Sequence, residues 1–309
     1  MHLIIAYAAT DRHPAALEAL QLPHLQRALQ LLQAQEPIRA DDDAPWLAHE
    51  AVHAQALGWP ETGPWPWAAH QTQSTQPTPQ AWVSPCHWRI GMDQVVMHPA
   101  EQLGLTLPQA QAIIDSLQPL LAEDGLQVRP HTPILWHAQG EILQDIRCAS
   151  LERMAGSLVK PWLTPESLPA PLRRLQSEAQ MLLYPHSVND ERAAMGLLPV
   201  NALWFHGAGR PQPTPGQAHT RFEAALHLPA LQAHAQAWVQ AWQALDQTAL
   251  ADFVRHLEGG GTGTLSLCSE SASQSWLPAP PRRWWQRWLR PAAPTPAQAL
   301  RTLLTHETD

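Results

Sequence analysis

The sequence is poor in several residue types, and each shortage excludes a class of protein. Its 309 residues include one lysine, Lys160, and three cysteines, Cys86, Cys148 and Cys268. The cysteines lie far apart with no Cys-x-x-Cys spacing, which argues against a disulfide framework and a structural zinc site. Charged residues make up only 15% of the chain and the formal net charge is −8, so nothing supports nucleic-acid binding.

Long apolar runs are also missing. No stretch approaches the roughly 20 apolar residues that a spanning helix needs, so we expect no membrane span. The first residues, MHLIIAYAATDRH, lack a basic segment followed by an apolar run of signal-peptide length. We therefore expect a soluble protein of the cytoplasm.

What is present favours a globular fold. Hydrophobic residues make up 45% of the chain, and there are 15 tryptophans against 3 phenylalanines and 2 tyrosines. Segments with strand and helix patterns alternate without a strict strand–helix–strand rhythm. This order predicts an α+β (mixed α/β) fold, with a mixed sheet and flanking helices.

Composition suggests three parts. Residues 1–80 begin with the apolar run LIIAYA and a helix, and end in a Pro- and Gln-rich stretch at 60–80 that we interpret as a linker. Residues 81–211 are expected to form an α+β domain. Residues 212–309 are mainly helical with a small β element, and we expect them to pack with residues 1–80.

Helix signals are clearest in TLPQAQAIIDSLQPLLAEDG. Thr106 is a suitable cap, Pro108 falls in the first turn and Gly125 follows the last. Pro119 lies inside this pattern and predicts a kink or a break.

Polar residues gather in LLYPHSVNDERAAMGLLPVNALWFHGAGR, residues 182–210. Backbone N–H groups in a Gly-x-Gly turn can approach an anion, and arginine can grip one with two bonds. The candidate catalytic residues are His186 and His206, and the candidate anion ligands are Asn189, Arg192, Asn201, Gly207 and Gly209. Alternatively, the asparagines tie down the turn by side-chain-to-backbone bonds and the glycines allow positive φ.

A second cluster lies in CHWRIGMDQVV. On an extended strand, alternation places His87 and Arg89 on one face, so both join the candidate anion ligands.

The 182–209 stretch resembles the cofactor-independent phosphoglycerate mutases of the archaeal type, whose inserted domain also matches residues 82–211 in the order of elements. Identical positions include His186, Asn189, Arg192 and Asn201, while His206 replaces an arginine. The resemblance implies a fold related to the alkaline-phosphatase-like enzymes, whose chemistry uses two divalent ions. After its first strand this chain reads AYAATDRH, without the family's Asp-Gly turn, so we expect no metal and no cofactor; Mn²⁺ or Mg²⁺ is the alternative.

Over nearly its full length the chain also resembles a proteobacterial family of regulatory proteins of the RpfE type, through SPCHWRIGMDQVVM and the 182–209 stretch. We therefore expect a non-catalytic regulatory protein that binds a small phosphorylated or carboxylate ligand or a partner protein. The alternative is an active phosphomutase or phosphatase, which predicts that His186, Arg192 and His206 converge on one pocket. The Trp- and Arg-rich segment 281–290 is the candidate surface for a protein partner.

Overall fold

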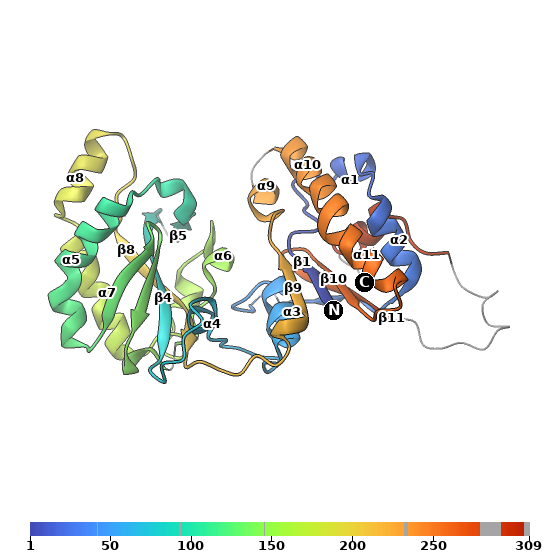
Figure 1. Cartoon of the computed structure of the whole chain (residues 1–309). Coiled ribbons are helices and arrows are strands. Elements are labelled where there is room, and N and C mark those ends of the chain that lie inside the picture. The colour runs from blue at the N-terminus through green and yellow to red at the C-terminus, as the bar shows by residue number, and fades with distance from the viewer. Residues whose placement is uncertain (42, 93, 145, 232–233, 279–291, 306–309) are drawn as a thin grey trace. The chain divides into compact units, whose positions relative to one another are not determined.

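Two compact units make up the chain (Figure 1). The computed structural model describes residues 1–41, 43–92, 94–144, 146–231, 234–278 and 292–305. The first unit comprises Met1–Glu61 and Thr214–Asp309, and the second comprises Thr62–Pro213. The boundaries therefore differ from the expected ones, because residues 62–80 belong to the second unit. The candidate partner segment 281–290 lies outside the described residues.

A six-stranded mixed sheet forms the centre of the first unit. The strand order is β2-β11-β10-β1-β9, and β3 pairs with β11. Strand β1 runs parallel to both β9 and β10, whereas β11 runs antiparallel to its neighbours. The bounds are β1 His2–Ile5, β2 Leu32–Ala34, β3 Ile38–Arg39, β9 Thr220–Glu223, β10 Thr264–Cys268 and β11 Ala272–Pro278.

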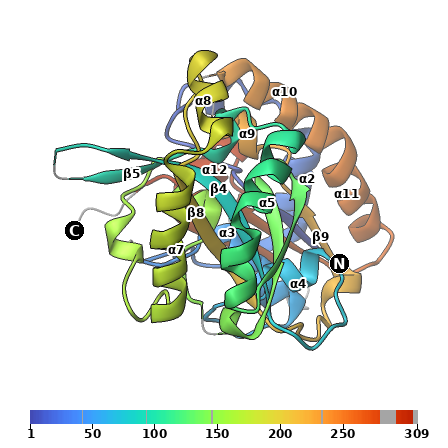
Figure 2. The same cartoon turned by 90° about the vertical axis from the view of Figure 1, so that its left-hand side faces the viewer.

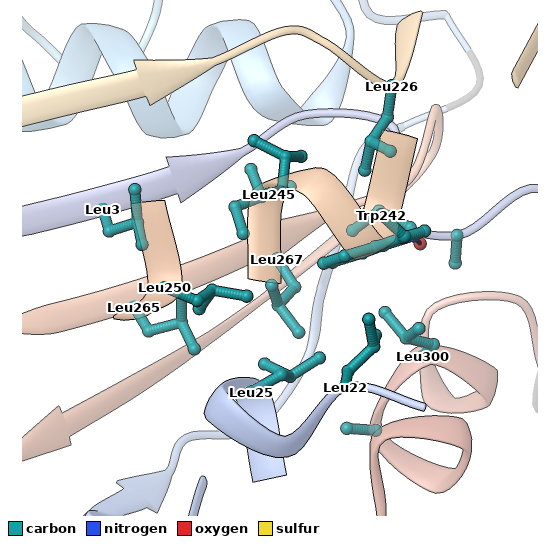
Figure 3. Packing of buried hydrophobic residues seen from close by; sticks show 14 of the residues in the cluster. Leu3, Leu22, Leu25, Leu226, Trp242, Leu245, Leu250, Leu265, Leu267 and Leu300 are labelled. Carbon is teal, nitrogen blue, oxygen red and sulfur yellow. Dashed lines mark hydrogen bonds between the residues drawn. The ribbon is translucent and has the colours of Figure 1, made fainter. Parts of the chain in front are cut away.

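Helices cover both faces of this sheet. Helix α3 contacts β1, β9, β10 and β11, while the face that carries Leu3 and Ile5 packs in the core against the other helices. Figure 3 shows this core, where Trp242 and Leu250 meet leucines of β10 and α2. The helices are α1 Ala16–Ala19, α2 Pro23–Leu31, α3 Ala48–Leu57, α9 His227–Leu231, α10 Ala235–Leu245, α11 Ala251–Glu258 and α12 Pro296–Thr302, with a π-helical turn at Asp246–Leu250.

The second unit has an antiparallel sheet of five strands. Its order is β5-β4-β7-β6, and β8 also pairs with β4. The strands are β4 Gln80–Ile90, β5 Val95–His98, β6 Gln127–Thr132, β7 Leu135–Gln139 and β8 Ala202–Gly209. The helices are α4 Trp67–Gln71, α5 Leu107–Glu123, α6 Leu151–Met154, α7 Ala170–Leu183 and α8 Ser187–Ala194.

Alternation along the strands gives this sheet two different faces. Ala81, Val83 and Phe205 point into a core that α5 and α7 close, and Figure 2 views the unit from the side of these helices. Successive side chains of a strand point to opposite faces. Trp82, Ser84 and His206 therefore lie on the other face, where α4 and α6 contribute to the packing.

Two local expectations are corrected. The stretch 60–80 is not a plain linker, because it contains α4, whose Ala68 and Ala69 are fully buried. Helix α5 begins after Thr106, as its cap signal predicts, but continues through Pro119 without a break. The predicted fold class, mixed α and β with helices flanking a mixed sheet, is confirmed. No helix among the described residues is long and apolar enough to cross a membrane.

Candidate functional site

The polar residues of α8 hold the backbone in place. His186 caps the helix, since its Nδ1 accepts from the backbone N–H of Val188 at 3.2 Å. The Asn189 amide donates to the carbonyls of Leu183, at 2.7 Å, and Val200, at 2.8 Å, and its oxygen accepts from the N–H of Val200 at 2.8 Å. Asn189 therefore ties the end of α7 to the segment that leads into β8.

Arg192 is fully buried and donates hydrogen bonds to two backbone carbonyls and one side-chain oxygen. Its guanidinium donates to the carbonyl oxygens of Leu198 at 2.8 Å and Leu103 at 2.6 Å, and to Oε1 of Gln109 at 3.2 Å. Removal from water lowers the pKa of this guanidinium. Arg192 was a candidate anion ligand, but its side chain has no exposed surface, and three of its five N–H groups already have protein acceptors. The geometry supports a structural role.

Asn201 and His87 fix the loop before β8 onto β4. The Asn201 oxygen accepts from the N–H of Trp88 at 2.7 Å, and its amide donates to the Trp88 carbonyl at 3.0 Å. Nδ1 of His87 bonds to the Pro199 carbonyl at 2.9 Å. The structure thus gives Asn189 and Asn201 backbone partners, as the alternative interpretation of the 182–210 stretch requires. His87, from the second cluster, also has a backbone partner. Arg89 is exposed, farther along β4.

Gly207 and Gly209 lie in β8 rather than in the expected turn, and they allow α4 to approach this strand. Gly207 has φ +58°, and a Cβ there would lie 3.1 Å from Cβ of Trp67. Gly209 has φ +144°, and a Cβ there would lie 3.2 Å from Cβ of Pro66. Close backbone packing explains both glycines without a bound anion.

The candidate residues do not converge on one pocket. Cys86 pairs with Ala202, whereas Trp82 pairs with His206, so His87 and His206 belong to opposite ends of the β4–β8 ladder. Four residues along a strand span about 13 Å. His206 also points away from the face that α5 and α7 cover. The joint action of His186, Arg192 and His206 that the enzyme alternative predicts therefore has no geometric support.

His206 instead belongs to a row of side chains that crosses the sheet. Trp82 of β4 is the direct partner of both His206 of β8 and His137 of β7, and His137 is the partner of Arg129 of β6. Direct cross-strand partners share a face, with Cβ atoms roughly 5 Å apart. We call these four residues, Arg129, His137, Trp82 and His206, the cross-strand row.

Uncharged hydrogen bonds position the three inner members of the cross-strand row. Nε2 of His206 lies 3.1 Å from Oγ of Ser84, and Nε2 of His137 lies 2.8 Å from Oε1 of Gln80. The Trp82 indole N–H donates to Oε1 of Gln71 at 2.7 Å, which fixes the ring between the two imidazoles.

An additional imidazole lies next to the row. The ring of His131 is 5.1 Å from that of Trp82, and the ring of His137 is 5.7 Å from it. His131 and Arg129 are exposed, whereas Trp82, His137 and His206 are buried. The end of the row that solvent can reach is therefore the end that carries the positive charge of Arg129.

Burial determines the charge of the two inner histidines. It lowers the pKa of His206 to about 3, against a smaller opposite effect of the Glu152 carboxylate. Burial, with the nearby positive charges of Arg129 and His131, lowers the pKa of His137 to about 4. Both imidazoles are neutral at pH 7. Arg129 has no carboxylate partner among the described residues, so the row carries an uncompensated positive charge.

Only His206 of the cross-strand row was a candidate from the sequence. Arg129, Trp82 and His137 were missed, because the row depends on the pairing of four strands between residues 82 and 206. Alternation could have indicated which face of each strand they occupy, but the sequence holds no direct signal for the register.

The first unit has a separate aromatic cluster after β1. Tyr7, at φ +55°, stacks on His227 with centroids 4.6 Å apart and lies 5.1 Å from the ring of His49. Tyr7 belongs to the segment AYAATDRH, which follows the first strand and lacks the Asp-Gly turn discussed above. Within the described ranges, no group of three or more His, Cys, Asp or Glu side chains is arranged to hold a metal ion.

The fold and the row define a protein of mixed α and β class with an imidazole- and indole-rich sheet face.

No protein-family model matches the sequence, and no curated protein does. Among solved structures, the PH0037 protein from Pyrococcus horikoshii is similar, with 11% identity, coverage of 90% of this chain and 87% of that chain, and a TM-score of 0.49. A cofactor-independent phosphoglycerate mutase from Thermoplasma acidophilum is also similar, with 15% identity, coverage of 89% and 88%, and a TM-score of 0.35. Because both TM-scores are below 0.5, we draw nothing further from these likenesses.

Proposed function

We propose that this protein binds a small anion, a phosphorylated or carboxylate metabolite, at the cross-strand row, and that it does so in a regulatory rather than a catalytic role. The observation that carries the proposal is the row itself, in which Arg129, His137, Trp82 and His206 share one face of the sheet in direct cross-strand register. The regulatory part rests on the sequence resemblance to RpfE-type proteins.

The chemistry of the row suits an anion. Arg129 supplies a planar, permanently charged guanidinium that can bind two oxygens of a phosphate or carboxylate. It is exposed and has no acidic partner within the described part of the chain. All four members are basic or aromatic, and the Glu152 carboxylate interacts with the row at His206, on the strand farthest from Arg129.

Nothing in the row resembles an activated nucleophile. Ser84 contacts His206, but its side chain is fully buried, and a histidine with a pKa of about 3 is a weak base. General-base catalysis is most efficient when the pKa of the base is near the working pH. This pair therefore favours a binding role over acyl or phosphoryl transfer.

Thermal unfolding in the presence of 3-phosphoglycerate, 2-phosphoglycerate and lactate tests the binding. A ligand at 100 times its dissociation constant stabilises the folded state by about 2.7 kcal/mol, so the midpoint should rise by several degrees. Arg129→Gln should abolish the rise. Arg89→Gln is the matched control, because it removes an exposed arginine of the same sheet that lies outside the row. If the ligand raised the unfolding midpoint of both variants equally, the ligand would bind outside the cross-strand row.

Catalysis is tested separately. Purified protein should not interconvert the two phosphoglycerates or release phosphate from them, with or without added Mn²⁺ or Mg²⁺. Turnover that a chelator abolishes would show that the protein is an enzyme and would overturn the non-catalytic proposal.

A further inference from the structure

The hydrogen bond of His137 fixes which of its nitrogens carries the proton. Its Nε2 faces Oε1 of Gln80 at 2.8 Å, and the amide nitrogen of Gln80 donates to Oγ of Ser74. Because an amide oxygen only accepts, Nε2 of His137 must be the protonated nitrogen. In the neutral ring Nδ1 is then an acceptor. It has no hydrogen-bond partner within the described residues.

A neutral His137 with this tautomer cannot donate to an anion. Its free nitrogen presents a lone pair, which would repel a phosphate oxygen, while its N–H is already used by Gln80. The ring becomes a donor toward a ligand only when Nδ1 also takes a proton. That imidazolium would keep its bond to Gln80 and would lie beside Arg129, its direct cross-strand partner.

We infer that the cross-strand row takes up one proton, at Nδ1 of His137, when it binds a dianionic phosphate or sulfate group. The inference rests on the proposed function, since it specifies how the same site meets its ligand. The proton comes from solvent, an N–H bond forms at Nδ1, and this N–H donates to a ligand oxygen. No bond of the ligand breaks.

The charges around the row explain why the proton arrives only with the anion. On β6, Arg129 and His131 repel a positive His137; on β8, His206 is a second neutral imidazole, with Glu152 of α6 near it. Helix α4, which packs on β4 and β8, carries one further titratable group, His70. A bound dianion reverses the field at His137 and offsets part of its desolvation, which favours the charged ring.

The ligand class follows from the same geometry. Arg129 and a protonated His137 lie on neighbouring strands, with Cβ atoms roughly 5 Å apart. A tetrahedral group offers several oxygens that can meet donors from both strands and balances two positive charges. A carboxylate carries one negative charge and would leave one of them unbalanced. We expect the row to prefer the phosphate end of a phosphorylated acid.

Calorimetric titration with sodium sulfate tests the inference on the intact protein. Sulfate stays a dianion between pH 5.5 and 7.5, so any proton taken up belongs to the protein. Repeating the titration in buffers of different ionisation enthalpy, at constant ionic strength, gives the number of protons. We expect up to one proton per sulfate, and an affinity that falls as pH rises, by up to about tenfold per pH unit.

Two variants locate the proton. His137→Gln retains an amide that can reach Gln80 but does not titrate, so proton uptake and the pH dependence should disappear. His219→Gln removes an exposed histidine of the first unit and should leave both unchanged. If His137→Gln fails to fold, ¹⁵N shifts of the His137 ring in the unaltered protein provide the same test, because sulfate should convert it to the imidazolium at pH 6.5.

The outcomes separate the two proposals. Sulfate binding that Arg129→Gln weakens, but that involves no proton uptake, would overturn this inference and leave the proposed function standing. Proton uptake that persists in His137→Gln would also overturn it, because another group would then be the acceptor. No binding of sulfate or phosphoglycerate at any pH in this range would overturn both.

Discussion

The guanidinium of Arg192 donates to the carbonyl oxygen of Leu103, 89 residues earlier in the chain, at 2.6 Å. Its other two bonds hold Gln109, in the first turn of α5, and the Leu198 carbonyl before β8. One buried side chain therefore joins three segments of the second unit. This explains a conspicuous arginine in a polar stretch without assigning it a ligand.

Replacing Arg192 should therefore damage stability rather than binding. Arg192→Ala leaves the buried carbonyl of Leu103 without its donor and removes a part-buried bond to Leu198. An unsatisfied buried group costs about 1–3 kcal/mol, and the cavity left by the side chain adds to this, so we expect a loss of about 2–5 kcal/mol. Denaturant unfolding measures the loss. Arg89→Ala, at an exposed position, should cost less than about 0.5 kcal/mol.

The protein that remains folded at low temperature should still bind phosphoglycerate with wild-type affinity. Specific loss of binding in a stable Arg192→Ala protein would return Arg192 to the candidate anion ligands.

Gly207 and Gly196 form a matched pair for backbone strain. Both have positive φ, +58° and +71°, but a Cβ at Gly207 would press on Trp67, whereas a Cβ at Gly196 would meet nothing within 4 Å. We expect Gly196→Ala to cost about 1 kcal/mol from its conformation alone, and Gly207→Ala to cost at least about 1 kcal/mol more. Equal unfolding free energies for the two variants would show that α4 yields easily at this contact.

Local features of the fold could be predicted from the sequence. The pairing of strands and the contacts between distant segments could not. The cap at Thr106 correctly marks the start of α5, because capping depends on residues three positions apart. Pro119 was misleading, since the helix continues through it. The side chains of Leu117, Leu120 and Leu121 bury α5 in the core, and we attribute the intact helix to this packing.

The candidate site shows the same division. Composition identified the polar stretch at 182–210, but its members turned out to hold backbone segments together, through partners such as Leu103 and Trp88 that are distant in sequence. The cross-strand row draws on residues 82, 129, 137 and 206. Each looks ordinary in its own strand, and only the register of four strands brings them together.

Asp246 provides a third test, in the first unit. It lies in the π-helical turn, is almost fully buried, and accepts from the backbone N–H groups of His24, at 3.2 Å, and Leu25, at 2.8 Å. It thus caps α2, whose own cap residue, Leu22, makes no side-chain bond.

Asp246→Ala should leave these N–H groups unsatisfied and cost about 2 kcal/mol or more. Amide hydrogen exchange at Leu25 should accelerate, and exchange in α5 of the second unit should not change. Asp252→Ala, at a half-exposed position in α11, is the control and should have little effect on Leu25. Unchanged exchange at Leu25 in the Asp246 variant would mean that α2 does not depend on this cap.

The buried histidines predict how stability depends on pH. In the folded protein the pKa is about 4 for His137 and about 3 for His206, both below the ordinary value of 6.5 expected after unfolding. Between these values the unfolded chain binds more protons than the folded one, so acid favours unfolding. Their contribution is fully present above pH 6.5 and is lost as pH falls toward 4. His2 of the first unit, with a pKa of about 4, acts in the same direction.

Unfolding free energies can be measured by denaturant between pH 7.5 and 5, in chloride without sulfate or phosphate. They should decrease as the pH is lowered. Each histidine contributes a slope of at most about 1.4 kcal/mol per pH unit. His206→Gln keeps a group that can bond to Ser84 but cannot titrate, so its slope should be smaller by up to that amount. His219→Gln, at an exposed position, should retain the wild-type slope. Identical slopes in all three proteins would show that His206 stays solvated and titrates normally.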